Sequence, residues 1–292
     1  MRIHRLIAGL LYAAILSCTT ADARGLFTYL LEHEPSRAKT EYRPKSLHRD
    51  EALALYSPRQ QQPGFSSCVD LFPGSRPLDP GIVPGKLRPL SLCSDQFAVL
   101  YSQTSKTPLI VVERLTSVQL RQARQQERTN AFFPDPRIPA SSRAELADFK
   151  DQSGIDRGHQ APAGDAGSER AMAQSFALSN MVAQDSNNNR GPWNTVESDV
   201  RKFVLRARGN VFVYTGPLFL GDHANGNVTI GRSVWVPSHL FKLVYDEASG
   251  RSWAYILPNA ASSVERPVDY ATFVARTGWR VLDGLSVTGS LR

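Results

Sequence analysis

The sequence lacks a run of apolar residues long enough to cross a membrane. No stretch in its 292 residues reaches the ~20 apolar residues of a spanning helix, and the best candidate, 6–18, is shorter. It has only three cysteines and no CxxC or Cys/His pattern, which argues against a structural zinc site. It also lacks a zinc finger, an RNP motif and a recognition-helix pattern, so reading of nucleic-acid bases is not expected.

The chain does contain enough apolar material for a folded core. Hydrophobic residues make up 41% and aromatic residues 9% of the sequence, which excludes a chain that is disordered throughout. The 20 glycines and 19 prolines indicate many turns and exclude a helical bundle or a coiled coil. Lysine and arginine (34) outnumber aspartate and glutamate (27), and the net charge of +7 weakly favours nucleic acid or another anionic partner.

The first 23 residues have the form of an export signal. A basic start, Met1–Arg5, precedes the apolar stretch 6–18, and Ala-Asp-Ala at 21–23 has the small-x-small form of a signal-peptidase site. We therefore expect residues 1–23 to be a signal peptide and the protein to be secreted or periplasmic. A membrane anchor is one alternative for this stretch. The other is lipidation, because the sequence LSC loosely resembles a lipoprotein box and would anchor the protein at Cys18.

Two cysteines remain in the body of the chain after such processing. In an oxidising compartment Cys68 and Cys93 most simply form a disulfide. The loop that they would close spans 25 residues, and chain-entropy arguments assign it a stabilisation of ~3 kcal/mol. Two unpaired buried thiols are the alternative.

The pattern along the chain predicts an α+β fold with a largely antiparallel sheet. Residues 24–64 are polar and basic without a sustained period, so we expect a flexible lead-in before a folded domain at 65–292. Asn187–Arg208 predicts a long helix with apolar residues at helical spacing, and Ser141–Phe149 predicts a short one. Short β-branched and aromatic runs predict strands at Phe97–Tyr101, Leu109–Glu113, Val211–Tyr214, Ser233–Val236, Leu240–Tyr245 and Trp253–Leu257.

The segment DRGHQAP, at 156–162, places a base beside a cation. Only a glycine separates Arg157 from His159. Phosphodiester cleavage needs a group that deprotonates water and a positive charge for the pentacoordinate phosphate. Imidazole titrates near pH ~6.5, so His159 offers a neutral base at physiological pH. Taken alone, a histidine near a proline is more often an ordinary surface or core residue.

A second pattern, N-x-x-x-W-x-x-x-E-x-x-x-R, spaces four side chains by four residues. On an α-helix these side chains would form a row along one face. An amide, a carboxylate and a guanidinium in one row can bind a hydrated cation and an anion together. The alternative is an ordinary helix with a core tryptophan and a Glu–Arg ion pair. The four residues are Asn189, Trp193, Glu197 and Arg201.

Together the two segments resemble the DNA/RNA non-specific endonucleases of the ββα-metal (His-Me finger) superfamily. The matching features occur in order: DRGHQAP, then FALSNMVAQ, then the pattern from Asn189 to Arg201. Supporting matches over roughly 66–260 are PLIVVERLT, FPDP, YTGP and VPSHLFK. The resemblance implies a ββα-metal core with a largely antiparallel sheet. It also implies hydrolysis of phosphodiester bonds in both DNA and RNA, with 5′-phosphorylated products.

The resemblance implies a base and a metal ligand. His159 would be the general base that activates water. Asn189 would be the only direct protein ligand of a Mg²⁺ ion, with Mn²⁺ as a substitute, and Glu197 would orient the metal-bound waters. Few protein ligands and many waters suit Mg²⁺ better than Zn²⁺. Three adjacent asparagines at 187–189 leave the register of the ligand open, although the four-residue step from Trp193 favours Asn189.

The resemblance also implies contacts to the phosphates of nucleic acid, bound without sequence specificity. Arg157 and Arg201 would neutralise the transition state, Arg128 would be a further phosphate contact, and Asn180 would support the site by a hydrogen bond. A non-catalytic nucleic-acid-binding protein on the same scaffold is one alternative, and an antibacterial nuclease toxin with a neutralising partner is another. The resemblance allows either a monomer or a homodimer, and it identifies no inhibitor partner.

Overall fold

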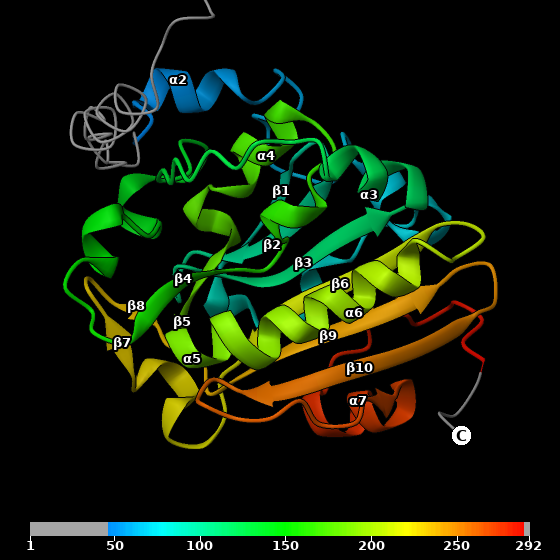
Figure 1. Ribbon diagram of the computed structural model, residues 1–292. Helices are drawn as coiled ribbons and strands as arrows, with labels where there is room; N and C mark the ends of the chain where they lie inside the picture. Colours follow the sequence, from blue (N-terminus) through cyan, green and yellow to red (C-terminus); the bar gives the residue numbers. More distant parts are fainter. Residues whose placement is uncertain (1–45, 289–292) are drawn as a thin grey trace, which may run out of the picture. The chain divides into compact units, whose positions relative to one another are not determined.

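The central element of the structure is a seven-stranded antiparallel sheet (Figure 1). The computed structural model describes residues 46–288, which lie in one unit of the chain, Pro44–Arg292. The β-branched and aromatic runs of the sequence form the long strands of this sheet. In spatial order the strands are β1 (Pro89–Cys93), β2 (Phe97–Ser102), β3 (Thr107–Leu115), β6 (Val211–Leu218), β9 (His239–Asp246), β10 (Arg251–Pro258) and β11 (Val268–Asp269), each antiparallel to its neighbour.

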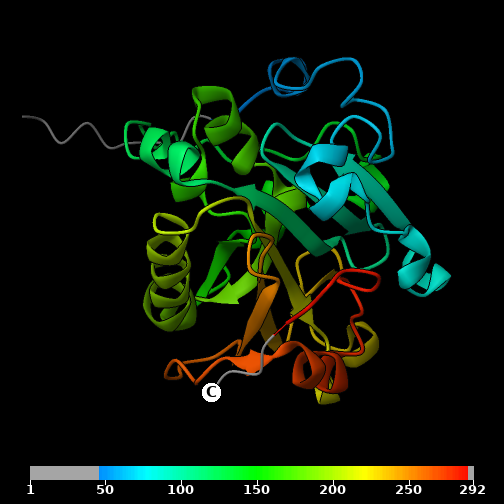
Figure 2. The same ribbon diagram turned by 90° about the vertical axis from the view of Figure 1, so that its right-hand side faces the viewer.

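Helices cover both faces of this sheet, so its strands are apolar on both sides. On one face Val213 and Val244 pack with Val200 and Val204 of α6 (Asn194–Val204). On the other face the aromatic rings of the sheet pack with α7 (Tyr270–Thr277). Figure 2 shows α6 and α7 on opposite sides of the sheet. The candidate catalytic residues lie on the α6 side.

A two-stranded sheet and a broken helix carry the motifs of the sequence. β4 (Ile155–His159) pairs with β5 (Met181–Asp185), which leads into α5 (Ser186–Asn188), a π-helical turn (Asn189–Trp193) and then α6. We expected a continuous helix over 187–208. The structure differs because Pro192 cannot donate a backbone hydrogen bond and clashes with the preceding turn. Gly191 takes up the distortion with φ −107° and ψ −105°.

The remaining elements are short. The helix expected over 141–149 is two 3₁₀ turns, Ala140–Ser142 and Leu146–Phe149. The strand expected at 233–236 is only Val234–Trp235. Between residues 46 and 288, no helix combines the length and apolar character needed to span a bilayer. The other elements are α2 (Arg49–Ala54), α3 (Ser117–Ala123), α4 (Glu169–Ser175), β7 (Thr229–Ile230), β8 (Val234–Trp235) and 3₁₀ turns at Val69–Leu71, Pro73–Ser75, Pro80–Ile82, Gly85–Leu87, Ala163–Asp165, Leu178–Asn180 and Gly221–Gly226.

Residues 46–64 differ from the expected flexible lead-in, because they pack on the folded domain. Ala52 and Tyr56 are buried among the side chains of a small apolar cluster that includes Phe176. The guanidinium carbon of Arg137 lies 3.7 Å from the centre of the Tyr56 ring, a cation–π contact. Two buried apolar side chains were too few to form a recognisable period in the sequence. The predicted signal peptide 1–23, Cys18 and residues 24–45 lie outside the described residues.

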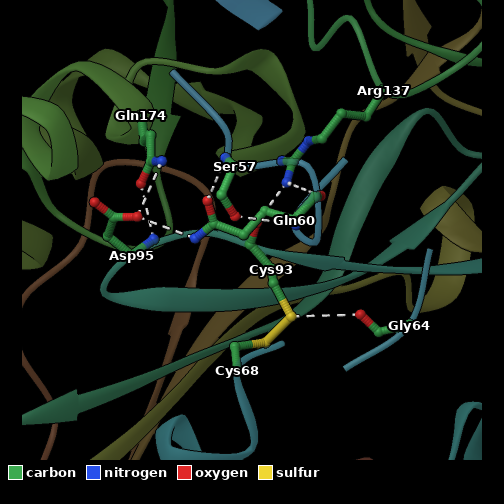
Figure 3. The surroundings of a disulfide bond; sticks show 8 residues. All are labelled: Ser57, Gln60, Gly64, Cys68, Cys93, Asp95, Arg137 and Gln174. Atoms are coloured by element: carbon green, nitrogen blue, oxygen red, sulfur yellow. Dashed lines mark hydrogen bonds between the residues drawn. A yellow bond between two sulfur atoms is a disulfide. The ribbon is translucent and has the colours of Figure 1, made fainter. Parts of the chain in front are cut away.

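The predicted disulfide between Cys68 and Cys93 is confirmed. Figure 3 shows that Arg137 reaches this region and donates to the carbonyl oxygen of Cys93. The guanidinium of Arg137 also pairs with the buried carboxylate of Asp135 at 2.6 Å. The same carboxylate accepts a hydrogen bond of 2.6 Å from the hydroxyl of Ser179. This chain of contacts connects the disulfide with the residue that precedes Asn180 of the candidate site.

Candidate active site

His159 lies at the end of β4, on the two-stranded sheet. The register pairs Arg157 with Ala183 and His159 with Met181. A glycine is required between the two candidate residues, because a β-carbon at Gly158 would lie 2.6 Å from the β-carbon of Gln184. The sequence R-G-H therefore lets the side chain of Gln184 pass close under the strand that presents the histidine.

Asn180 holds the turn that follows His159. Its amide oxygen accepts from the backbone N–H of Ala161 at 2.9 Å, and its amide nitrogen donates to the carbonyls of Ala161 and Ser175, each at 2.9 Å. Its own backbone carbonyl accepts from Gln160 at 3.0 Å. The side chain is fully buried. Asn180 thus fixes the backbone on the C-terminal side of the histidine, as a supporting residue would.

The imidazole of His159 is held between two phenylalanine rings. The ring of Phe176 stands edge-on at a centroid distance of 5.0 Å, and that of Phe132 is tilted at 5.7 Å. Only 9% of His159 is exposed to solvent. Burial, with smaller effects from Arg128 and Arg157, lowers the pKa of His159 from 6.5 to about 3. The histidine is therefore neutral at pH 7, the state that a general base requires.

Each phenylalanine that contacts His159 also carries an arginine. The guanidinium carbon of Arg157 lies 4.3 Å from the centre of the Phe132 ring, and that of Arg128 lies 5.2 Å from the centre of the Phe176 ring. Burial lowers the pKa of both arginines. The structure therefore brings Arg128, which comes from a loop after α3, to the same cluster as the DRGH motif. Two cations beside a neutral imidazole form a positively charged cluster that can bind a phosphate.

The three adjacent asparagines have different surroundings. Asn188 is fully buried and donates to the carbonyl of Pro258 at 2.8 Å, so it is part of the core. Asn187 is exposed. Asn189, in the π-helical turn, donates its amide nitrogen to Asp156 at 2.9 Å. Because a carboxylate accepts hydrogen bonds only, this contact directs the amide oxygen of Asn189 away from Asp156.

Asp156 belongs to the DRGH motif but was not predicted as a site residue. Besides Asn189, it binds Arg190 through two hydrogen bonds of 2.9 and 2.7 Å. Partial burial would raise its pKa, but the hydrogen bonds from Arg190 and Asn189 outweigh that effect and lower the pKa of Asp156. An ionised Asp156 therefore fixes the orientation of the amide, as the outer partners of metal ligands commonly do.

Glu197 and Arg201 lie on α6, and a third residue joins them. Arg201 pairs with Asp165 at 3.1 Å and more loosely with Glu197 at 3.8 Å. Burial raises the pKa of Glu197, and the positive charges of Lys242 and Arg201 partly offset that rise. The expected straight row from Asn189 to Arg201 is interrupted, because the π-helical turn Asn189–Trp193 changes the helical spacing. Trp193 itself is fully buried beside Val182 and Leu240. The ion pair with Asp165 therefore neutralises part of the charge of Arg201. Asp165 was not among the predicted site residues.

The described residues suit a hydrated hard cation in their donor chemistry. An amide oxygen on Asn189 and a carboxylate on Glu197 are the kinds of ligand that Mg²⁺ takes, directly or through water. Over residues 46–288 no group of three or more His, Cys, Asp or Glu side chains is placed to hold a metal.

Comparison with known proteins decides the family. The model of the DNA/RNA non-specific endonuclease family matches residues 82–287. The chain belongs to this family. A solved structure of similar fold, the EndoG/EndoGI complex described as showing the mechanism of EndoG inhibition, aligns with a TM-score of 0.57 and 28% identity over 64% of this chain and 83% of that chain. The predicted family and the ββα-metal fold class are therefore confirmed.

Curated relatives of this family member are nucleases. Nuclease EXOG of Danio rerio is 38% identical over 55% of this chain and 50% of its own length, and human endonuclease G is 36% identical over 61% and 60%. Nuclease C1 of Cunninghamella echinulata is 34% identical over 63% of this chain and 77% of its own length. The matched regions span about half the length of Nuclease EXOG from Danio rerio (50%) and from Homo sapiens (49%), and of Nuclease 1 from Schizosaccharomyces pombe (54%).

The prediction of a secreted or periplasmic protein is wrong by this comparison. The relatives from Danio rerio, Homo sapiens, Schizosaccharomyces pombe and Saccharomyces cerevisiae are all named mitochondrial nucleases, and this finding contradicts the prediction. A basic start followed by apolar residues was interpreted as an export signal. Organelle-targeting segments are also basic and poor in acidic residues, so composition near the N-terminus does not separate the two destinations.

Proposed function

We propose that this chain is a metal-dependent endonuclease that hydrolyses phosphodiester bonds of DNA and RNA without sequence specificity. The observation that carries the proposal is the neutral imidazole of His159 between two phenylalanine rings, with Arg128 and Arg157 beside it. A base and two cations in one cluster match the needs of phosphoryl transfer to water. Membership of a non-specific endonuclease family supports the same chemistry.

In this proposal His159 takes the proton from the attacking water. In the protein without substrate, burial and, to a smaller extent, the two nearby arginines lower the pKa of His159 to about 3. The imidazole would therefore be a weak base before substrate binds. A phosphate bound to Arg128 and Arg157 would neutralise those charges and raise the basicity of the imidazole. Substrate binding itself would then prepare the base for catalysis.

The other residues have supporting tasks. Asn180 keeps the turn after His159 in place, and Arg201 contributes positive charge from α6. Asn189 would hold a Mg²⁺ ion through its amide oxygen, with Glu197 orienting the water molecules around it. When bound, the ion would stabilise negative charge on the departing 3′ oxygen, and cleavage of that P–O bond would leave a 5′-phosphate on the other product. Attack by water requires no 2′-hydroxyl, which explains why both DNA and RNA would be substrates.

The test uses the purified full chain on plasmid DNA, single-stranded DNA and RNA. We expect all three to be degraded with Mg²⁺ or Mn²⁺, cleavage to stop with EDTA, and the products to carry 5′-phosphates. His159→Ala should abolish cleavage and retain DNA binding, while the matched variant of the exposed His48, His48→Ala, should cut normally. Binding by the wild type without metal-dependent cutting would contradict the proposal and favour a non-catalytic nucleic-acid-binding protein.

A protein inhibitor is a further partner that we propose for this site. The support is the solved complex of EndoG with EndoGI, which is similar to this chain. Co-purification of a small acidic protein that blocks cleavage would identify such a partner. A nuclease recovered alone and fully active from its source cells would argue against it.

A further inference from the structure

Lys242 is a buried cation under the candidate active site. It lies in the middle of β9, opposite Thr215 of β6, on the sheet face that α6 covers. Only 1% of the residue is exposed, although lysine is among the residues least often fully buried. Burial of an ammonium group is costly unless hydrogen bonds and opposite charges compensate it. A lysine in this place therefore needs a physical explanation.

The contacts of Lys242 reach both halves of the site. Its ammonium donates to the hydroxyl of Thr215 at 2.7 Å and, through a longer bond, to the backbone carbonyl of Gln160 at 3.4 Å. It also lies 5.4 Å from the centre of the Trp193 ring. Gln160 is the residue after His159. In the sequence, Trp193 lies midway between the candidate metal ligand Asn189 and Glu197. Lys242 therefore contacts both the turn that carries His159 and the helical segment around Trp193.

Gln160 is held from two sides. Its N–H donates to the carbonyl of Asn180 at 3.0 Å, while its own carbonyl accepts from Lys242. Its side chain is fully buried, and neither the amide oxygen nor the amide nitrogen has a hydrogen-bond partner in the described part of the chain. The position of Gln160 therefore depends on these two backbone contacts, which adjoin the β4–β5 pairing that holds His159 itself.

Opposite charges from three elements surround the ammonium group. Burial raises the pKa of Glu113 on β3, of Asp165 after β4 and of Glu197 on α6, and the positive charge of Lys242 partly offsets each rise. Arg201 is the second cation near these carboxylates. Charge balance alone could therefore explain the lysine. Glu113 is buried and has no role in the proposed chemistry, so this alternative can be tested through Glu113.

We propose that Lys242 is a positioning residue that holds the turn carrying His159 and the helical segment around Trp193 in register on the sheet. The proposal rests on the proposed function, because it concerns the alignment of the proposed base with the proposed metal-binding segment. Lys242 touches no substrate and acts through Gln160 and Trp193. A displacement of about 1 Å between such groups can lower turnover about 10²-fold.

The experiment compares the variants Lys242→Met, Glu113→Gln, the double variant Lys242→Met/Glu113→Gln, and the exposed control Lys202→Met. Lys242→Met alone should lose stability because it removes one of the two cations near the buried Glu113. In the double variant both side chains of this buried pair are replaced by neutral ones, so the midpoint of urea unfolding should return toward the wild-type value. We expect its kcat to stay about 10²-fold low with KM within about threefold of wild type. Glu113→Gln and Lys202→Met should keep wild-type activity.

Amide hydrogen exchange gives a readout that is independent of activity and metal. In the double variant the amides of Gln160 and Ala161 should exchange about tenfold faster than in the wild type, while those of β10 stay unchanged. A double variant that regains full kcat, or that keeps wild-type protection at these two amides, would show that Lys242 only balances charge. If the wild type proves inactive, the proposed function fails, and the exchange data still decide the role of Lys242.

Discussion

Replacing His159 with glutamine should change how the stability of the protein depends on pH. The imidazole is buried between Phe132 and Phe176, and its pKa falls from 6.5 to about 3. The unfolded chain therefore binds a proton between these two pH values that the folded chain does not bind. Stability rises with pH where the unfolded state holds more protons, so the wild type should lose stability as pH falls below 6.5.

The magnitude follows from the two pKa values. Each pKa unit corresponds to about 1.4 kcal/mol, so a drop from pH 7 to pH 5 should cost the wild type about 2 kcal/mol through His159 alone. Below about pH 3 the cost should level off near 5 kcal/mol, since both states are then protonated. Burial of 91% of the residue's surface, equivalent to its exposure of 9%, justifies using the shift with little correction for solvent.

Urea unfolding followed by circular dichroism at pH 7 and pH 5 measures the effect. The quantity of interest is the change in unfolding free energy between the two pH values, for the wild type minus His159→Gln. Titrating groups shared by both proteins cancel in this difference. A difference near zero would refute the lowered pKa of the imidazole, and with it the proposal that a bound phosphate must raise the basicity of His159.

Three further variants test the structure. Gly158→Ala should destabilise the protein by about 1–3 kcal/mol in urea unfolding and impair cleavage, because the new β-carbon would overlap the side chain of Gln184; unchanged stability would contradict the close approach. Asp156→Asn should raise the Mg²⁺ concentration needed for half-maximal cleavage about 10–100-fold by releasing the amide that the ion would bind; an unchanged requirement in a Mg²⁺ titration would exclude that role. The double variant Cys68→Ser/Cys93→Ser should lower the unfolding free energy by about 3 kcal/mol and leave kcat at 25 °C near the wild-type value. A loss of kcat without a loss of stability would contradict a purely stabilising role of the disulfide.

Local patterns predicted five strands of the seven-stranded sheet (β2, β3, β6, β9 and β10) but not β1, β11 or the small sheet formed by β4 and β5. The strands around Val111 and Val213 consist of consecutive apolar, β-branched residues, which suit a sheet covered on both faces. β4 has no such pattern, because its sequence is Ile-Asp-Arg-Gly-His. It is a strand because β5 pairs with it over its whole length. Pairing between segments 26 residues apart is a tertiary effect that local spacing does not contain.

The candidate site shows the same division. The spacing of the motifs predicted the arginine and histidine of DRGH and the helical residues after Asn189. Arg128 was predicted only from the resemblance, and its place beside the DRGH motif is seen only in the cation–π contact with Phe176, 48 residues away. Lys242 lies within the apolar run LFKLVY, which predicted a strand and gave no sign of a buried ammonium group. Residues that support a site from other elements leave no mark at the motif itself.

The burial of the disulfide determines when its redox state can change. Cys68 is 3% and Cys93 is 0% exposed, and the carbonyl of Cys93 is held by Arg137. A reducing thiol must reach a sulfur atom to attack it, so reduction has to wait until this part of the chain opens. The pair would thus preserve the oxidation state acquired while the chain folded, even after transfer to a compartment of different redox potential.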